Sequence, residues 1–121
     1  MKSVRIVTRD DKPEATNATA MLTTALAARG VSISEAPELL IAVGGDGTVL
    51  SAAADAIELD IPVCGVNVGR VGYLAEFEVT EIDELVDAIA SDSYRVAERS
   101  VLRVDVGEIS AFAVNDVVVE K

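Results

Sequence analysis

Residues 44–48 read Gly-Gly-Asp-Gly-Thr, directly after the apolar run 39–43 and before an alanine-rich segment. A buried strand followed at once by a helix would place these glycines at the carboxyl end of a parallel sheet, where α/β proteins bind ligands. Glycines let backbone N–H groups approach an anion, and a helix N-terminus adds positive partial charge. Asp46 among such donors could act as a general base or as a ligand of a phosphate-bound metal ion. The structural alternative is a tight turn in which Asp46 or Thr48 caps the helix.

Other familiar phosphate-binding and catalytic motifs are missing from the sequence. There is no lysine between Lys12 and Lys121, which excludes a P-loop, and the dinucleotide pattern G-x-G-x-x-G does not occur. Phosphate chemistry would therefore depend on backbone amides, a metal ion and Arg70, which could equally be a solvated loop residue. The absence of histidine excludes histidine-based triads and most zinc sites. Cys64 is the single cysteine, so we expect a small core residue rather than a disulfide.

Two further segments combine glycine or asparagine with polar residues. Residues 65–76 contain Gly65, Gly69 and Gly72 at a spacing that only resembles a dinucleotide motif. Asn115 and Asp116 interrupt a β-rich run. Because successive strand residues face opposite sides, these two side chains cannot both enter one pocket from a regular strand. They must lie at a strand end or bulge, or only one of them contacts a ligand through its side chain.

Taken in order along the chain, the three segments resemble the motifs of NAD kinases. Residues 44–53 resemble the GGDGT loop, residues 65–76 resemble the block written GxNxGxLGFL, and residues 113–118 resemble the Asn-Glu or Asn-Asp motif. The GGDGT loop alone is shared with lipid kinases and phosphofructokinases, whereas the second block is discriminating. The resemblance covers nearly the whole chain.

The resemblance also implies residue roles. Asp46 corresponds to the proton acceptor for the 2′-hydroxyl of the adenosine ribose of NAD, and Asn115 and Asp116 correspond to the residues that hold the adenosine. Tyr73 stands where the family usually has the phenylalanine that lines the NAD pocket. The implied nucleotide-binding set comprises Gly44, Gly45, Asp46, Gly47, Thr48, Asn67, Gly69, Arg70, Tyr73, Asn115 and Asp116. It includes no assigned protein ligand of a metal ion.

The implied reaction is phosphoryl transfer from ATP, or from polyphosphate, to NAD, giving NADP with Mg²⁺ or another divalent metal. One alternative is another GGDGT kinase acting on a lipid or sugar phosphate. The other is a nucleotide-binding or assembly module without catalysis. The sequence does not distinguish NAD from NADH as the substrate.

The patterns around the motifs predict an α/β fold with a mainly parallel sheet flanked by helices. We expect strands at 4–8, 31–34, 39–43 and 63–66, a long helix from Pro13 that ends at Gly30, and a second helix over 49–57. Small alanine side chains would let this second helix lie close to the sheet. A third helix, capped by Thr80, would bury the stripe Ile82, Leu85, Val86 and Ile89.

The chain changes character after Ser91. Residues 101–106 and 111–119 are predicted to form a β-hairpin. We therefore divide the chain into a nucleotide-binding domain over 1–95 and a hairpin over 96–121. The resemblance implies that this hairpin leads into an all-β domain that completes the NAD site. Since the sequence ends at Lys121, we expect an inactive, truncated domain that associates through its C-terminal strands or folds the hairpin back on the α/β layer.

Charge is the unusual feature of the composition. Ten basic and 21 acidic residues give a formal net charge of −11, which disfavours nucleic acids and anionic membranes as partners. Such a surface over an aliphatic core is typical of proteins from a high-salt cytoplasm, and we expect a halophilic archaeal source. No apolar run is long enough to cross a membrane, and no signal peptide precedes the first strand, so we expect a cytoplasmic chain. The expected partners are small nucleotides and copies of the chain itself.

Overall fold

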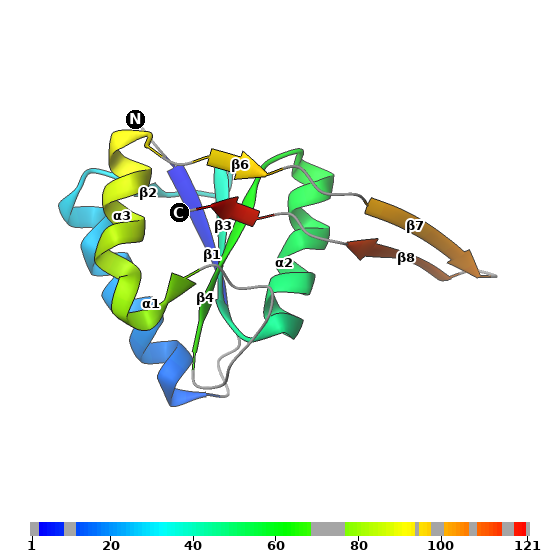
Figure 1. Cartoon of the computed structure of the whole chain (residues 1–121), viewed down its shortest axis with the longest axis horizontal. Helices are drawn as coiled ribbons and strands as arrows, with labels where there is room; N and C mark the ends of the chain where they lie inside the picture. The colour runs from blue at the N-terminus through cyan, green and yellow to red at the C-terminus, as the bar shows by residue number, and fades with distance from the viewer. Residues whose placement is uncertain are drawn as a thin grey trace.

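The computed structural model describes the backbone of residues 3–8, 12–68, 77–93, 95–97, 101–106, 109–114 and 118–120, with side chains for the first three ranges. Five parallel strands form the main sheet in the order β2-β1-β3-β4-β5 (Figure 1). The strands and helices of this region are β1 (Ser3–Thr8), α1 (Pro13–Ala28), β2 (Ser32–Ile33), β3 (Leu39–Gly44), α2 (Asp46–Leu59), β4 (Val63–Asn67), β5 (Phe77–Glu78), the 3-10 turn η1 (Val79–Glu81) and α3 (Ile82–Ser91). The predicted parallel α/β fold is confirmed.

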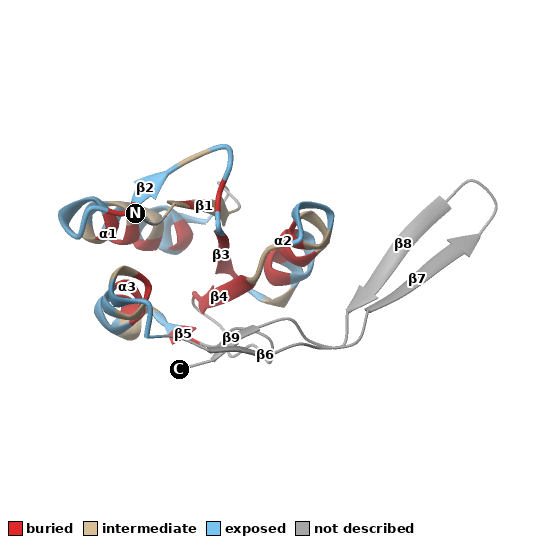
Figure 2. Ribbon diagram, turned by 90° about the horizontal axis from the view of Figure 1, so that it is seen from above, coloured by how far each residue is buried: buried red, intermediate tan, exposed pale blue. Residues whose placement is uncertain are grey.

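Helices cover both faces of this sheet. Figure 2 shows α1 and α3 on one side and α2 on the other. The central strand β3 is buried along its whole length, and its side chains alternate between the two layers. Leu39, Ile41 and Val43 belong to the cluster beneath α1 and α3, whereas Leu40 and Ala42 belong to the cluster beneath α2. A strand covered on both faces needs apolar residues at every position, which explains the unbroken run in the sequence.

Small residues determine how α2 packs. Ala52, Ala53 and Ala56 form its buried face against Leu40, Ala42 and Val63. Alanine side chains are short, so the helix axis lies close to the strands, as the sequence predicted. The helix ends at Asp60, whose φ of 55° places it in the left-handed region. A similar left-handed turn follows α1, where Gly30 has a φ of 75°, and this glycine confirms the predicted helix end.

The sheet order creates a switch point at its centre. From β1 the chain crosses to β2 on one side, and from β3 it crosses to β4 on the other. Connections that leave neighbouring strands in opposite directions open a crevice at the carboxyl ends of those strands, and ligands of open α/β sheets bind there. The carboxyl ends of β1 and β3 are Thr8 and Gly44, and the Thr8 hydroxyl donates a hydrogen bond to the carbonyl of Val43 at 3.1 Å.

The remaining strands form two antiparallel pairs: β6 (Arg95–Ala97) with β9 (Val118–Glu120), and β7 (Val101–Val106) with β8 (Ile109–Val114). The predicted hairpin is confirmed in β7 and β8, which extend away from the sheet in Figure 1. The predicted continuous strand over 111–119 is wrong, because β8 ends at Val114 and a separate strand β9 pairs with β6. The strand β6 was not predicted, since three residues show no periodicity.

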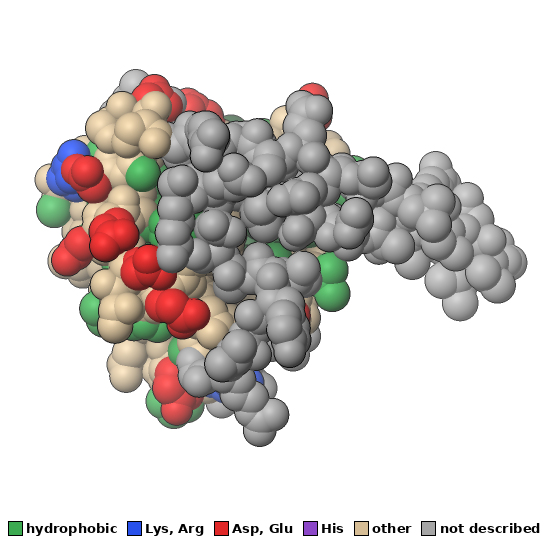
Figure 3. Space-filling model, viewed as in Figure 1, with side chains coloured by type: hydrophobic (Ala, Val, Ile, Leu, Met, Phe, Trp, Pro, Cys, Tyr) green, Lys and Arg blue, Asp and Glu red, His purple; other side chains and the backbone are tan. Residues whose placement is uncertain are grey.

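Carboxylates dominate one surface of the domain. Figure 3 shows acidic side chains gathered over α3, where Asp83, Glu84 and Asp87 are exposed. The guanidinium of Arg29 lies 2.8 Å from the Asp87 carboxylate. A second ion pair joins β1 to α2, with the Arg5 guanidinium 3.5 Å from the Asp55 carboxylate. Within residues 3–8, 12–68 and 77–93, no helix is long and apolar enough to span a membrane.

This charge distribution predicts that salt stabilises the protein. Raising KCl from millimolar to molar concentration screens the mutual repulsion of the carboxylates, so we expect the melting temperature to rise by several degrees. Differential scanning calorimetry over a KCl series measures this effect. A midpoint that stays constant or falls would contradict the prediction and, with it, the expectation of a halophilic source.

Candidate nucleotide-binding site

Three adjacent strands end in register at one edge of the sheet. Gly44 ends β3, Asn67 ends β4 and Glu78 ends β5. Gly44 is paired with Asn67, and Asn67 is paired with Glu78. The backbone N–H of Val68 donates to the Gly44 carbonyl at 3.1 Å, which extends the contact by one residue. We call Gly44, Asn67 and Glu78 the terminal row.

The terminal row lies on the face that α2 covers. The preceding residues Val43, Val66 and Phe77 belong to the core beneath α1 and α3. Because side chains alternate along a strand, the next residue of each strand faces the opposite layer. The terminal row therefore faces the same side of the sheet as α2, and its member Gly44 lies against Thr48 in the first turn of that helix.

Gly44 permits a close contact between β3 and α2. A Cβ atom on Gly44 would lie 2.6 Å from the hydroxyl oxygen and 3.0 Å from the Cβ of Thr48, and the φ of Gly44 is 157°. Both facts favour glycine. Thr48, which is only 5% exposed, fills the space that a side chain at position 44 would need. The first turn of the helix is thereby held against the end of the strand.

The helix α2 begins earlier than the sequence predicted. Asp46 is its first residue and is half-buried, so Asp46, Gly47 and Thr48 form the first turn instead of a loop. The helix N-cap is Gly45, in extended conformation, and no side chain caps the helix by a hydrogen bond. The structural alternative, in which Asp46 or Thr48 is the N-cap, is therefore wrong. A helix N-terminus without a side-chain cap can direct its N–H groups and positive partial charge toward an anion.

Asn67 is a buried polar residue in the middle of the terminal row. Its side chain is 5% exposed, and its Nδ2 donates to the Oε2 of Glu78 at 3.4 Å. Its Oδ1 is buried and has no hydrogen-bond partner among the residues that the structure describes. Buried amide oxygens are nearly always paired in proteins, so this atom requires a structural or functional explanation.

Glu78 is the member of the terminal row that the sequence motifs did not identify. It lies on a two-residue strand without periodicity, two residues beyond the motif block 65–76. The signal that could have found it is the Glu-x-x-Glu spacing of a capping box, which joins Glu78 and Glu81 at η1. The backbone N–H of Glu78 donates to the Oε1 of Glu81 at 3.0 Å. The predicted cap Thr80 is wrong, because it lies inside η1 and α3 starts two residues later.

The structure thus brings together six of the predicted site residues: Gly44, Gly45, Asp46, Gly47, Thr48 and Asn67. The other five, Gly69, Arg70, Tyr73, Asn115 and Asp116, lie outside the described residues. Among the described residues, no group of three histidine, cysteine or carboxylate side chains is arranged to hold a metal ion.

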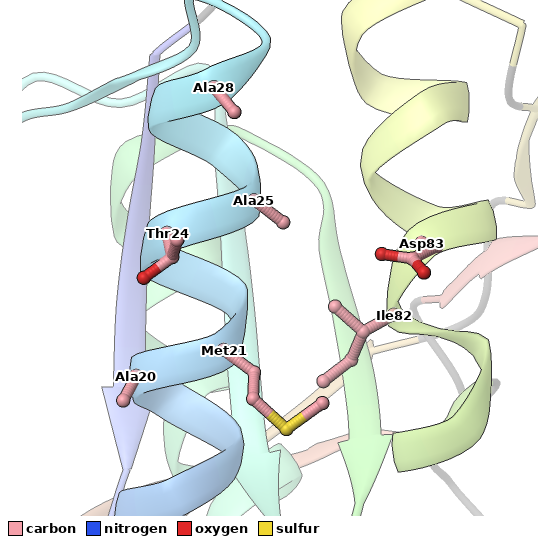
Figure 4. Close-up of a pocket in the computed structure, with 7 residues that line it drawn as sticks. All are labelled: Ala20, Met21, Thr24, Ala25, Ala28, Ile82 and Asp83. Carbon is pink, nitrogen blue, oxygen red and sulfur yellow. The ribbon is translucent and has the colours of Figure 1, made fainter.

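A second concave surface differs from this site in its lining and in its position. It is an open groove of about 510 Å³ between α1 and α3 (Figure 4). Its lining is mostly apolar, with Met21 and Ile82 pointing into the space between the helices and Asp83 at its rim. It contains none of the predicted site residues and lies on the opposite face of the sheet from α2. The groove is therefore not the candidate site.

Comparison with known proteins identifies the family. Residues 32–94 match the ATP-NAD kinase N-terminal domain. An NAD kinase of Heliobacterium modesticaldum is 35% identical over 147 aligned positions, which cover 100% of this chain and 52% of that protein. An NAD kinase of Mycolicibacterium paratuberculosis is 46% identical over 101 residues, covering 79% of this chain and 31% of that protein.

A solved structure shows the same fold. Yeast NADH kinase, crystallised as a complex with NADH, superimposes with a TM-score of 0.67 at 16% identity, covering 99% of this chain and 46% of that chain. The chain spans about half or less of the length of these relatives. With the match over residues 32–94 and the GGDGT turn at the start of α2, the chain belongs to the ATP-NAD kinase family.

Proposed function

We propose that this domain takes part in phosphoryl transfer to the 2′-hydroxyl of NAD, giving NADP, with Asp46 as the proton acceptor. The observation that carries the proposal is the position of Asp46: it starts α2 at the switch point of a parallel sheet, beside a helix N-terminus that no side chain caps. Anionic phosphates bind at such termini. A carboxylate at the same place repels phosphate, so its presence favours a chemical role such as that of a general base.

The chain's own residues would act as follows. The first turn of α2, held against β3 by the contact between Gly44 and Thr48, orients the donor phosphates. Asp46 accepts the proton of the 2′-hydroxyl while the 2′-oxygen forms the new bond to the transferred phosphorus. The bond between the transferred phosphorus and the bridging oxygen of the donor breaks, and the electron pair stays on the leaving phosphate. Such a site works by positioning and by electrostatic stabilisation.

The donor and the metal follow from the same chemistry. We propose ATP as the donor, with polyphosphate as the alternative. A divalent ion such as Mg²⁺ is commonly held largely by substrate phosphates and water. Such an ion, when bound, neutralises charge on the donor phosphates. Asp46 is the residue of this turn that would contact it.

We propose that Gly69, Arg70, Tyr73, Asn115 and Asp116 complete the nucleotide pocket, in the roles that the family motifs imply.

We also propose that residues 1–95 form the nucleotide-binding domain and that the strands from 96 to 121 belong to a second unit. In the described backbone, β7 and β8 pair only with each other, so each keeps an open edge that can recruit a further strand. We propose that copies of the protein associate there, and sedimentation at several concentrations would test this, a monomer throughout contradicting it.

A ligand screen tests the proposed function against its alternatives. A ligand that binds only the folded state raises both the free energy of unfolding and the melting temperature. At a ligand concentration one hundred times Kd, the gain in free energy is about 2.7 kcal/mol. We expect NAD, NADP and ATP to raise the midpoint and diacylglycerol to leave it unchanged. Stabilisation by the lipid alone would favour a lipid kinase. Stabilisation by none of the nucleotides would contradict a nucleotide-binding role.

A further inference from the structure

We propose that Glu78 is a positioning residue for nucleotide binding, because its carboxylate determines which end of the Asn67 amide faces the first turn of α2. The inference rests on the proposed function and extends it to a residue outside the family motifs quoted above. It is carried by three observations: the Asn67–Glu78 hydrogen bond, the burial of Asn67 and the unpartnered Oδ1 of Asn67.

The geometry of an amide makes the contact directional. The donor Nδ2 and the acceptor Oδ1 lie on opposite arms of the same planar group. Glu78 belongs to β5, on one side of β4, whereas Gly44 belongs to β3, on the other side. With Nδ2 held toward Glu78 at 3.4 Å, Oδ1 turns to the β3 side, where Gly44 has no side chain and Thr48 of α2 covers the strand end.

A carboxylate fixes this orientation better than any other side chain. Carboxylate oxygens only accept hydrogen bonds, so the amide nitrogen of Asn67 must face Glu78. The same carboxylate accepts the backbone N–H of Glu81 in the capping box, while Glu81 accepts from the backbone of Glu78. Glu78 is therefore held by η1 on one side while it orients Asn67 on the other.

The orientation has a consequence for specificity. The N-terminus of α2 presents N–H donors and attracts phosphate, whereas the oxygen of Asn67 is an acceptor and repels it. Next to the phosphate-binding turn, the site then favours a ligand group that donates a hydrogen bond. In a nucleotide such groups are the ribose hydroxyls and the base amine. We infer that Asn67 distinguishes the nucleoside part of the substrate from its phosphates.

A reciprocal exchange tests this inference in the complete gene product, with the Kd for NAD measured by titration calorimetry. Asn67→Asp places two carboxylates in contact, and we expect NAD binding to weaken at least tenfold. Adding Glu78→Gln reverses the donor and acceptor of the hydrogen bond and leaves an oxygen facing α2, so the double variant should return to within about threefold of the unaltered protein. The matched control, Glu81→Ala, removes only the Glu81 side-chain half of the capping box and keeps the backbone N–H that the Glu78 carboxylate accepts. It should lower the melting temperature while leaving Kd within twofold.

The outcomes separate the inference from the proposed function. No rescue by the second substitution, in a variant that still melts cooperatively, would show that Glu78 does not act through Asn67. Failure of the unaltered protein to bind NAD would contradict the proposed function instead. The contact itself is then read without ligand from the side-chain amide resonances of Asn67, which should shift in Glu78→Ala and stay in place in Glu81→Ala. Unchanged Asn67 resonances in Glu78→Ala would overturn the inference.

Discussion

Replacing Asp46 by asparagine is expected to lower kcat of the complete gene product by a factor of about 10² to 10⁴ while NAD still binds. The substitution keeps the size and planarity of the side chain but removes the proton acceptor. Asp46 is the first residue of α2, so asparagine leaves the helix and its contact with β3 in place. Loss of a base acts on the transition state more than on binding, and the effect should appear in kcat rather than KM. Steady-state kinetics coupled to NADP formation measures both constants.

Asp55 provides a matched control on the same helix. Its carboxylate pairs with Arg5 at 3.5 Å, with the Asp55 side chain 48% exposed. Asp55 lies nine residues beyond Asp46 on α2. Exposed ion pairs contribute little to stability, so Asp55→Asn should leave kcat and the melting temperature nearly unchanged. Turnover of Asp46→Asn at the level of the unaltered protein would contradict the assignment of the base. Equal losses in both variants would point to an effect of net charge instead.

The second large effect is expected from Gly44→Ala. The new methyl group would lie 2.6 Å from the Thr48 hydroxyl, at a φ of 157° that alanine rarely adopts. Overpacking and backbone strain each cost about 1–3 kcal/mol. Since Thr48 is buried and belongs to the first turn of α2, the turn must move away from β3. We expect the free energy of unfolding, measured by urea unfolding, to fall by about 2 kcal/mol or more. We also expect weaker binding of ATP, measured by calorimetry.

The neighbouring glycine separates folding from binding. A Cβ atom on Gly45 would meet nothing within 4 Å, and the residue is exposed at the helix N-cap. Gly45→Ala should therefore cost less than about 1 kcal/mol of stability. If phosphates approach the backbone at this point, the same methyl group should weaken ATP binding. A Gly44→Ala variant as stable as the Gly45→Ala variant would show that the close contact with Thr48 is not required.

The parallel sheet and the GGDGT turn could be predicted because both depend on local sequence. An unbroken apolar run needs cover on both faces, and glycines directly after it mark a strand end. The start of α2 was placed three residues too late, because glycine and aspartate at 45–47 read as a loop. The structure starts the helix at Asp46, and the tertiary contact between Gly44 and Thr48 holds this first turn against β3.

The contribution of Glu78 could not be read from the sequence in the same way. A strand of two residues has no periodicity, and its place beside β4 depends on pairing across the intervening segment. The split between β8 and β9 has a similar cause, since β9 is defined by its partner β6 and not by its own composition. Long-range strand pairing therefore determines the separation of β8 from β9 and the position of Glu78, neither of which local sequence patterns specify.

The most direct measurement is the fate of the transferred phosphoryl group. The complete gene product is incubated with NAD and with ATP labelled at its γ-phosphate, with a parallel reaction in which polyphosphate is the donor. NADP is identified with a dehydrogenase that reduces NADP but not NAD. We expect labelled NADP from the unaltered protein and almost none from Asp46→Asn. Label that appears in a lipid or sugar phosphate, with NAD unchanged, would contradict the proposed NAD kinase activity.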